Sequence, residues 1–321
     1  MTIFINQSVE LDNISKDKFN FNDADDYFVL ATAGDVSQNF ITFGNGADDS
    51  VEADSNVSWN WITFGNGADD FVGTASSNIS WNWITFGDGG SDYVSAGGGI
   101  DHNWITYGDG GENFVTGFGN ISQNAITFGD GGENSVTAAV NISQNDITFG
   151  SGGADFISDS YGNMSQNKIT FGDGDSDHVS VGSSSRDAIT FGNGLQDRFD
   201  LSGKIDHDTI TFGNGADDVA TVLGNSSYDT VKFGYGDFDY LYIWGSSSDD
   251  TVNLGNGSND YVNLEDTAHD LIIVGSGNSD NVFLGVSSVT AVGGDTVITG
   301  TGAHDKFPLK LIVMPTRLVS H

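Results

Sequence analysis

Residues 59–72 read WNWITFGNGADDFV and residues 81–94 read WNWITFGDGGSDYV, so one pattern returns after 22 residues. The Ile of its Ile-Thr-Phe triplet has β-branched counterparts along most of the chain. They are Ile41, Ile62, Ile84, Ile105, Ile126, Ile147, Ile169, Ile189, Ile210, Val231, Val252 and Ile272. Ile41 and Ile272 lie 231 residues apart over eleven intervals, which gives a period of 21. A fixed period of this size predicts a solenoid.

Each unit divides into two similar halves, and each half is a tight turn followed by a short strand. Side chains alternate along a strand, so Ile41 and Phe43 point to one face and Thr42 to the other. We therefore expect an all-β fold, a parallel β-solenoid (a β-roll or two-sheet β-helix) of about thirteen 21-residue coils. The expected divisions are an N-terminal cap or leader at 1–18, the solenoid at 19–307, and a C-terminal tail at 308–321 that serves as cap, secretion signal or assembly segment.

The chain is strongly acidic, with 10 Lys and Arg against 45 Asp and Glu, a formal charge of -35. This balance argues against nucleic acid as a partner and favours cations, because nucleic-acid affinity comes largely from Lys and Arg. The absence of Cys excludes disulfides and thiolate metal sites. No N-terminal secretory signal or membrane-spanning stretch is recognisable, so we expect a cytosolic protein or export without a cleaved signal.

Two files of Asp and Asn follow the repeat. The first file lies five residues after a turn glycine and consists of Asp49, Asp70, Asp92, Asp155, Asp177, Asp197, Asp218, Asp239, Asp260 and Asp280, with Asn113 and Asn134 in the same register. The second file is Asn39, Asn60, Asn82, Asn103, Asn124, Asn145 and Asn167, and then Asp187, Asp208, Asp229, Asp250 and Asp270. Stacked carboxylates repel one another by about 1 kcal/mol per neighbour in water, which favours a counter-ion along each acidic file.

The turn Gly65-Asn66-Gly67-Ala68-Asp69-Asp70-Phe71-Val72 resembles the calcium-binding nonapeptide of the RTX (repeats-in-toxin) family, a parallel β-helix signature. The resemblance implies a β-roll, Ca²⁺ bound between turns by carbonyls and aspartates, and type I secretion to the extracellular space or cell surface. This chain departs from the family in having one extra residue before the Asp and 21 residues per coil in place of 18.

From these observations we expect Ca²⁺ as the cofactor, held at the Asp positions of both files. Calcium should lie on one edge in the N-terminal half and on both edges beyond about residue 187, because a neutral Asn file stacks without an ion. Such binding would couple to folding. The alternative is that the Asp residues only cap turns through backbone amides.

Two outward-facing features suggest contact surfaces. Five of the six Trp, namely Trp59, Trp61, Trp81, Trp83 and Trp104, fall on adjacent coils and predict a surface for another protomer or a sugar, unless they only cover the sheet edge. A file of Thr that runs from Thr42 to Thr211 is similar to ice-binding faces, but its neighbouring column is irregular. Thr is also simply a favourable solvent-facing strand residue.

No catalytic constellation is recognisable, so we expect that the protein is not an enzyme. Polysaccharide lyases of the β-helix type are the enzymatic alternative, but they need long loops and basic residues that interrupt the repeat. The expected function is a secreted, calcium-binding structural protein that self-assembles into a fibril, surface layer or biofilm matrix. The alternative is a ligand-binding solenoid, either a polysaccharide adhesin or an ice-binding protein.

Overall fold

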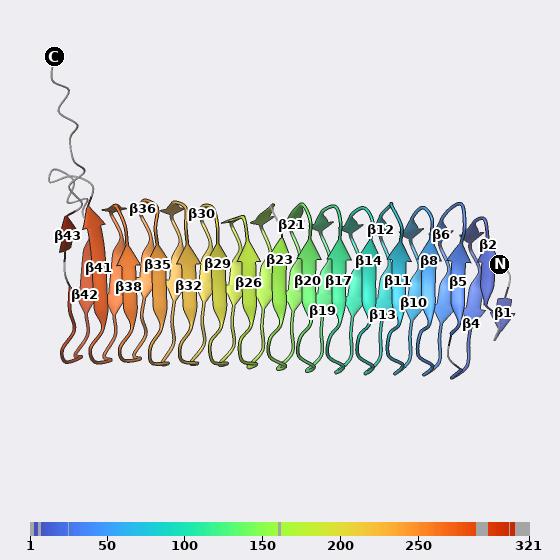
Figure 1. The fold of residues 1–321 in the computed structure, drawn as a ribbon, viewed down its shortest axis with the longest axis horizontal. Coiled ribbons are helices and arrows are strands. Elements are labelled where there is room, and N and C mark those ends of the chain that lie inside the picture. Colours follow the sequence, from blue (N-terminus) through green and yellow to red (C-terminus); the bar gives the residue numbers. More distant parts are fainter. Residues whose placement is uncertain are drawn as a thin grey trace, which may run out of the picture.

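The computed structural model describes residues 3–5, 8–24, 26–159, 162–286, 295–307 and 309–311. Every regular element within these residues is a β-strand, and the strands stack into a rod that runs from β1 (Ile3–Ile5) to β43 (Leu309–Leu311) (Figure 1). The predicted parallel β-solenoid of about thirteen coils is confirmed. The strands form three sheets in place of the expected two, with 15, 15 and 13 strands.

The coil order is sheet A, sheet B, sheet C. The strands of sheet A are β1, β4 (Lys18–Asn20), β7 (Phe40–Thr42), β10 (Trp61–Thr63), β13 (Trp83–Thr85), β16 (Trp104–Thr106), β19 (Ala125–Thr127), β22 (Asp146–Thr148), β25 (Lys168–Thr170), β28 (Ala188–Thr190), β31 (Thr209–Thr211), β34 (Thr230–Lys232), β37 (Thr251–Asn253), β40 (Leu271–Val274) and β42 (Thr296–Thr299).

Sheet B follows the glycine-rich turn. Its strands are β2 (Val9–Leu11), β5 (Phe28–Ala31), β8 (Ser50–Ala53), β11 (Phe71–Thr74), β14 (Tyr93–Ala96), β17 (Phe114–Gly117), β20 (Ser135–Ala138), β23 (Phe156–Asp159), β26 (His178–Val181), β29 (Arg198–Leu201), β32 (Val219–Val222), β35 (Tyr240–Ile243), β38 (Tyr261–Leu264), β41 (Asn281–Val286) and β43.

Sheet C has strands of only two or three residues. They are β3 (Ile14–Ser15), β6 (Val36–Ser37), β9 (Val57–Ser58), β12 (Ile79–Ser80), β15 (Ile100–Asp101), β18 (Ile121–Ser122), β21 (Asn141–Ser143), β24 (Asn163–Ser165), β27 (Ser183–Ser185), β30 (Ile205–Asp206), β33 (Ser226–Ser227), β36 (Ser247–Ser248) and β39 (Thr267–Ala268). These strands are too short to show an alternating pattern, which explains why the sequence predicts two sheets.

Strands also occur in the segments expected as an N-terminal cap or leader (1–18) and a C-terminal tail (308–321). Strands β1, β2 and β3 lie within residues 1–18 and pair in parallel with β4, β5 and β6. At the other end β43 pairs with β41, while residues 308 and 312–321 of the expected tail lie outside the described residues.

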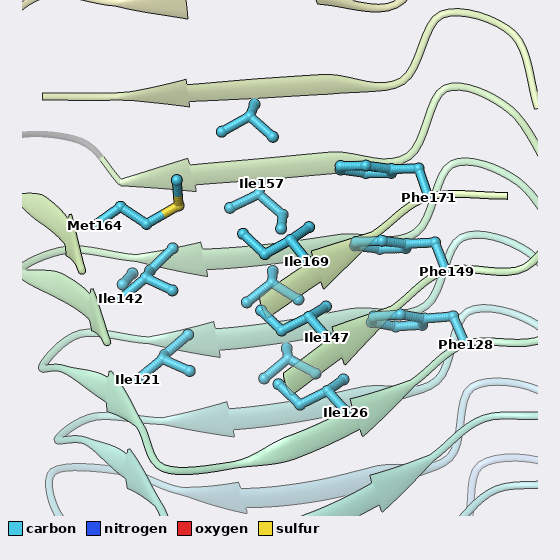
Figure 2. Close-up of a cluster of buried hydrophobic side chains, with 14 of the residues drawn as sticks. Ile121, Ile126, Phe128, Ile142, Ile147, Phe149, Ile157, Met164, Ile169 and Phe171 are labelled. Carbon is cyan, nitrogen blue, oxygen red and sulfur yellow. The ribbon is translucent and has the colours of Figure 1, made fainter. Parts of the chain in front are cut away.

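The core is built from stacked columns, one or two from each sheet (Figure 2). The Ile column of sheet A is in register, so that Ile147 pairs with Ile126 and Ile169, and all three are buried. The aromatic residue that follows each of these strands stacks on the next at 4.7–4.9 Å between ring centroids, from Phe21 to Phe233. The predicted inward positions are thus confirmed.

Close stacking explains the glycines of the turn between sheets A and B. A Cβ on Gly65 would lie 2.0 Å from the carbonyl oxygen of Gly44, and one on Gly67 would lie 1.7 Å from that of Gly46. The turns therefore tolerate no side chain at these two positions.

Within the described residues, a non-glycine residue with left-handed backbone lies immediately before each position of the two files, such as Asp69 (φ 61°) and Trp81 (φ 58°). Left-handed backbone at these positions lets the next side chain point inward, so both files face the interior.

Candidate functional sites

The first file lies at the end of the glycine-rich turn, just before sheet B, and its side chains are buried. Each backbone N–H donates to the Oδ1 atom of the file residue one coil later. Asp49 donates to Asp70 at 3.0 Å, Asp70 donates to Asp92 at 2.9 Å, and the ladder continues to Asp305. Oδ1 therefore acts as the turn cap that the alternative interpretation describes.

The second carboxylate oxygen in this file has a different environment. For nine acids, Oδ2 is buried and has no hydrogen-bond partner among the described residues; they are Asp70, Asp92, Asp155, Asp177, Asp197, Asp218, Asp239, Asp260 and Asp280. Burial raises the pKa of Asp70, Asp177, Asp239 and Asp260 to about 8. A buried charge without a partner is costly, so this file favours a neutral or compensated state.

The second file lies between sheets C and A, and its Asn half forms an amide ladder. The backbone N–H and the side-chain Nδ2 of Asn82 both donate to Oδ1 of Asn103 at 3.0 Å. The same Nδ2 also donates to the backbone carbonyl of Val57 at 2.9 Å. The side-chain oxygen and nitrogen atoms of the Asn file thus form hydrogen bonds inside the rod, as expected from the sequence.

In the Asp half of the second file, serine hydroxyls donate to four of the five acids, whereas Oδ2 of Asp208, which follows Ile205, is buried without a partner among the described residues. Ser184 Oγ donates to Oδ2 of Asp187 at 2.8 Å, and Ser226 Oγ donates to Oδ2 of Asp229 at 2.9 Å. Ser247 Oγ bridges Oδ2 of Asp250 (3.0 Å) and of Asp270 (2.7 Å). At Asp187, Asp229 and Asp250 a serine three residues earlier stands where the Asn coils have Val, Ile or Met, and sequence analysis missed this pairing.

The residues of both files fit calcium poorly in this arrangement. Ca²⁺ takes six to eight oxygen ligands, whereas Oδ1 of each file residue already accepts a backbone N–H. Within the described residues, no group of three or more His, Asp or Glu side chains is placed to hold a metal ion. Calcium binding at these Asp residues stays a prediction, and the unpartnered Oδ2 atoms of the first file are the carboxylate oxygens left to contribute to it.

The Trp residues line a trough of about 1010 Å³ at the corner between sheets C and A. One wall, here called the turn wall, contains Trp59, Trp81 and His102, which stack at 4.9 Å and 4.0 Å between ring centroids. The opposite wall, the strand wall, contains Phe40, Trp61, Trp83 and Trp104, and its three Trp rings stack at 4.9 Å. The five Trp side chains are 41–58% exposed, so both walls face solvent.

The buried Asn ladder forms the floor between the two walls. Beyond His102 the turn wall continues as glutamines, in which Gln123 Nε2 donates to Gln144 Oε1 at 2.8 Å. Sequence analysis identified the Trp residues but missed Phe40, His102 and the glutamines. Their position in the repeat could have identified them, since each lies directly before or after an Asn of the second file.

Two of the Trp residues occupy an unfavourable backbone conformation. Trp59 and Trp81 have φ values of 59° and 58°, in the left-handed region that bulky residues rarely adopt. Backbone preference therefore does not explain Trp at these positions. Both side chains are about half exposed and stack on each other at 4.9 Å between ring centroids.

The described residues contain no helix long and apolar enough to span a membrane. Comparison with protein-family models, curated proteins and solved structures finds no match to this chain.

Proposed function

We propose that this protein is a non-enzymatic binding solenoid that holds a linear, uncharged polysaccharide in the aromatic trough. The observation that carries the proposal is the pair of half-exposed aromatic walls that flank one continuous trough along the rod. Ligand sites are commonly lined by aromatic side chains with a few polar groups that orient the ligand. Here the amides of Gln123 and Gln144 and the imidazole of His102 are those polar groups.

The regular spacing of equivalent side chains along the trough matches a linear polymer. Its lining extends from Gln38 to Asp146 over six successive coils, which corresponds to about 24 Å at a strand spacing of about 4.8 Å. A sugar ring in a linear chain advances by about the same length, so successive sugars would meet equivalent groups on successive coils.

Charge favours an uncharged ligand over an acidic one. The chain has a formal charge of -35, and the trough is lined mainly by aromatic and amide side chains. A polyuronate would be repelled by this field at low ionic strength. A neutral glucan or an N-acetylated glycan would not.

Tryptophan fluorescence tests this proposal directly, because five of the six Trp lie in the trough. Titration with soluble linear β-glucan and chito-oligosaccharides should give saturable quenching. Trp83→Ala should weaken binding by at least tenfold, whereas Trp244→Ala, which removes an exposed Trp outside the trough, should not. Equal affinity of the two variants, or binding of a polyuronate alone, contradicts the proposal.

A second candidate is the self-associating extracellular rod that the sequence suggests. The same exposed walls favour it, since two apolar ridges can interlock with those of a second copy. The charge of -35 opposes association, so screening by salt should promote it. Sedimentation velocity distinguishes the candidates: growth of oligomers with salt that Trp83→Ala abolishes supports the rod, and a stable monomer that binds glycan supports the first function.

A further inference from the structure

A second exposed pair of rings lies on the same corner of the rod as the trough. His207 and Tyr228 stack at 5.0 Å between ring centroids, and both are exposed. Each directly precedes an Asp of the second file, as Trp81 and His102 directly precede an Asn of that file. The pair, here called the far platform, is therefore in line with the turn wall, and 105 residues, or five coils of 21, separate His102 from His207.

The histidine of the turn wall belongs to a small hydrogen-bonded unit. The tripeptide Ile-Asp-His occurs twice in the chain, at 100–102 and at 205–207. In the first copy, His102 Nδ1 lies 2.7 Å from Asp101 Oδ2, and Ser122 Oγ of the next coil donates to Asp101 Oδ1 at 2.9 Å. The carboxylate thus fixes the orientation of the imidazole that stacks on the Trp rings.

The far platform contains the same unit. His207 Nδ1 lies 3.0 Å from Asp206 Oδ1, and Ser227 Oγ of the next coil donates to that oxygen at 3.0 Å. Because a carboxylate accepts the hydrogen of Nδ1, Nε2 of the neutral ring is left as an acceptor for a ligand hydroxyl. The two copies therefore present the same combination, an oriented imidazole stacked on an exposed aromatic ring.

The column between the two histidines consists of polar, planar side chains. Gln144 Nε2 donates to Gln166 Oε1 at 3.1 Å, which extends the ladder that starts at Gln123. Arg186 occupies the next coil and is exposed. Amide and guanidinium groups form hydrogen bonds with hydroxyl groups. The turn wall therefore offers a hydrogen-bonding side chain on each coil between the trough and the far platform.

The strand wall becomes low over the same coils. Its register continues through the first residues of the later sheet A strands, where Ala188, Thr209 and Thr230 follow one another. Between these small side chains and the trough, Lys168 Nζ lies 3.3 Å from Asp146 Oδ1, so these two charges compensate each other. The space beside the far platform is therefore open to an uncharged ligand.

We propose that the turn wall and the far platform form one extended binding track for a single linear, uncharged polysaccharide chain. This inference rests on the function proposed above. From Trp59 to Tyr228 is 169 residues, or eight coils of 21. The track is thus about 38 Å long, enough for about nine sugars at one sugar per coil. Aromatic rings hold both ends of the bound segment, and the polar column holds its middle.

The dependence of affinity on ligand length tests the extended track. The probes are linear β-glucan oligosaccharides and chito-oligosaccharides of four and of ten sugar residues, with Trp quenching as the readout of the trough. The wild type should bind the ten-residue form about tenfold or more tighter than the four-residue form, because only the longer chain reaches both ends. Tyr228→Asn and His207→Asn should each lower this ratio about fivefold.

Asparagine is the chosen replacement because it tolerates the left-handed backbone of Tyr228 (φ 57°) and His207 (φ 59°). Tyr235→Asn is the matched control. It removes an exposed Tyr from the turn between sheets A and B, where Asn214 and Asn256 occupy the equivalent position in other coils. This control should keep the wild-type ratio.

The outcomes separate the extended track from the proposed function. A wild-type ratio near one, or an unchanged ratio in both Tyr228→Asn and His207→Asn, overturns the track. If Trp83→Ala still weakens the binding of both lengths, the trough remains the binding site. Absence of quenching by both lengths of both oligosaccharide series overturns the proposed function and the track with it.

Discussion

The two files share one backbone hydrogen bond but differ in what surrounds the outer side-chain atom. In the first file Oδ2 of Asp177 lies buried beside a glycine turn without a donor. In the second file Oδ2 of Asp229 accepts hydrogen bonds from the hydroxyl of Ser226 (2.9 Å) and the amide of Ser227 (3.0 Å). The same residue type thus meets two environments at two corners of the coil, one at each end of sheet A.

This difference shows that an Asp file on a solenoid is not by itself evidence of an ion. Donors within the coil reach Oδ2 of Asp229 in the second file, although burial still raises the pKa of its carboxyl to about 7. Oδ2 of Asp177 in the first file has no such donor among the described residues, so its carboxyl needs a proton, a cation or a rearrangement. In the coils around Asn113, Asn124 and Asn134, both files consist of neutral amides. These coils therefore contain no buried file carboxylate that needs a partner.

The largest expected effect is the response of the whole protein to pH. The folded-state pKa of first-file acids is raised by burial to about 7 for Asp155 and about 8 for Asp239, above their unfolded value. The folded state therefore binds more protons between about pH 4 and pH 8, and the free energy of unfolding falls as pH rises through this window. We expect the unfolding temperature to fall by about 10 °C or more from pH 5 to pH 8, as measured by circular dichroism.

Hydrogen exchange can localise this effect along the rod. Coils near Asn113 and Asn124 contain Asn in both files and should keep their protection at pH 8, whereas coils near Asp218 and Asp229, with Asp in both, should lose it first. Uniform loss of protection along the chain would contradict the expected difference between Asn and Asp coils. Greater stability at pH 8 than at pH 5 without added cations would contradict the expected effect of the buried acids.

An intermediate effect is expected when an acid is placed in the Asn ladder. Asn82→Asp removes the donors to Val57 and Asn103 and leaves a carboxylate beside Ile79, with no serine. At pH 7 it should destabilise the fold by about 2–4 kcal/mol, as for a buried charge without a partner. Chemical denaturation at pH 7 and pH 5 measures the loss, which should shrink at the lower pH.

Two variants control this experiment. Asn66→Asp makes the same exchange at an exposed turn position where Asp88 and Asp109 occur naturally, and should be nearly neutral. Ile79→Ser combined with Asn82→Asp recreates the serine–aspartate pair of the later coils. A double-mutant cycle should show favourable coupling of about 1 kcal/mol; no coupling would mean that the serines do not stabilise these acids.

The smallest effect is expected from removal of one serine donor. Ser247→Ala deletes hydrogen bonds to Oδ2 of Asp250 and Asp270 and should cost about 1–3 kcal/mol. Ser248→Ala, the adjacent half-buried serine, is the control and should change the unfolding free energy by less than about 0.5 kcal/mol. Equal effects of the two substitutions would indicate that the hydroxyl of Ser247 is not a specific partner.

The repeat predicts which residues of the candidate sites stack on one another, but it does not predict whether they are buried or what they contact. The period places Asp70 above Asp49, and Trp83 above Trp61, without any structure, because in-register stacking aligns equivalent residues. The pattern does not reveal whether a polar file faces the interior or the solvent. That depends on the left-handed residue before each file position, which is as varied as Asp69, Trp81 and Gln123 and leaves no consistent residue type to recognise.

The sequence alone determined the period, the parallel solenoid and the residues that stack in columns, because each of these depends only on repetition and side-chain alternation. The tertiary structure decided that there are three sheets, that both files are buried, and that the Trp residues form two walls instead of one cluster. These features depend on how the chain turns at each corner. Backbone dihedral angles set that direction, and single residues such as Trp81 adopt them only because the neighbouring coils hold them in place.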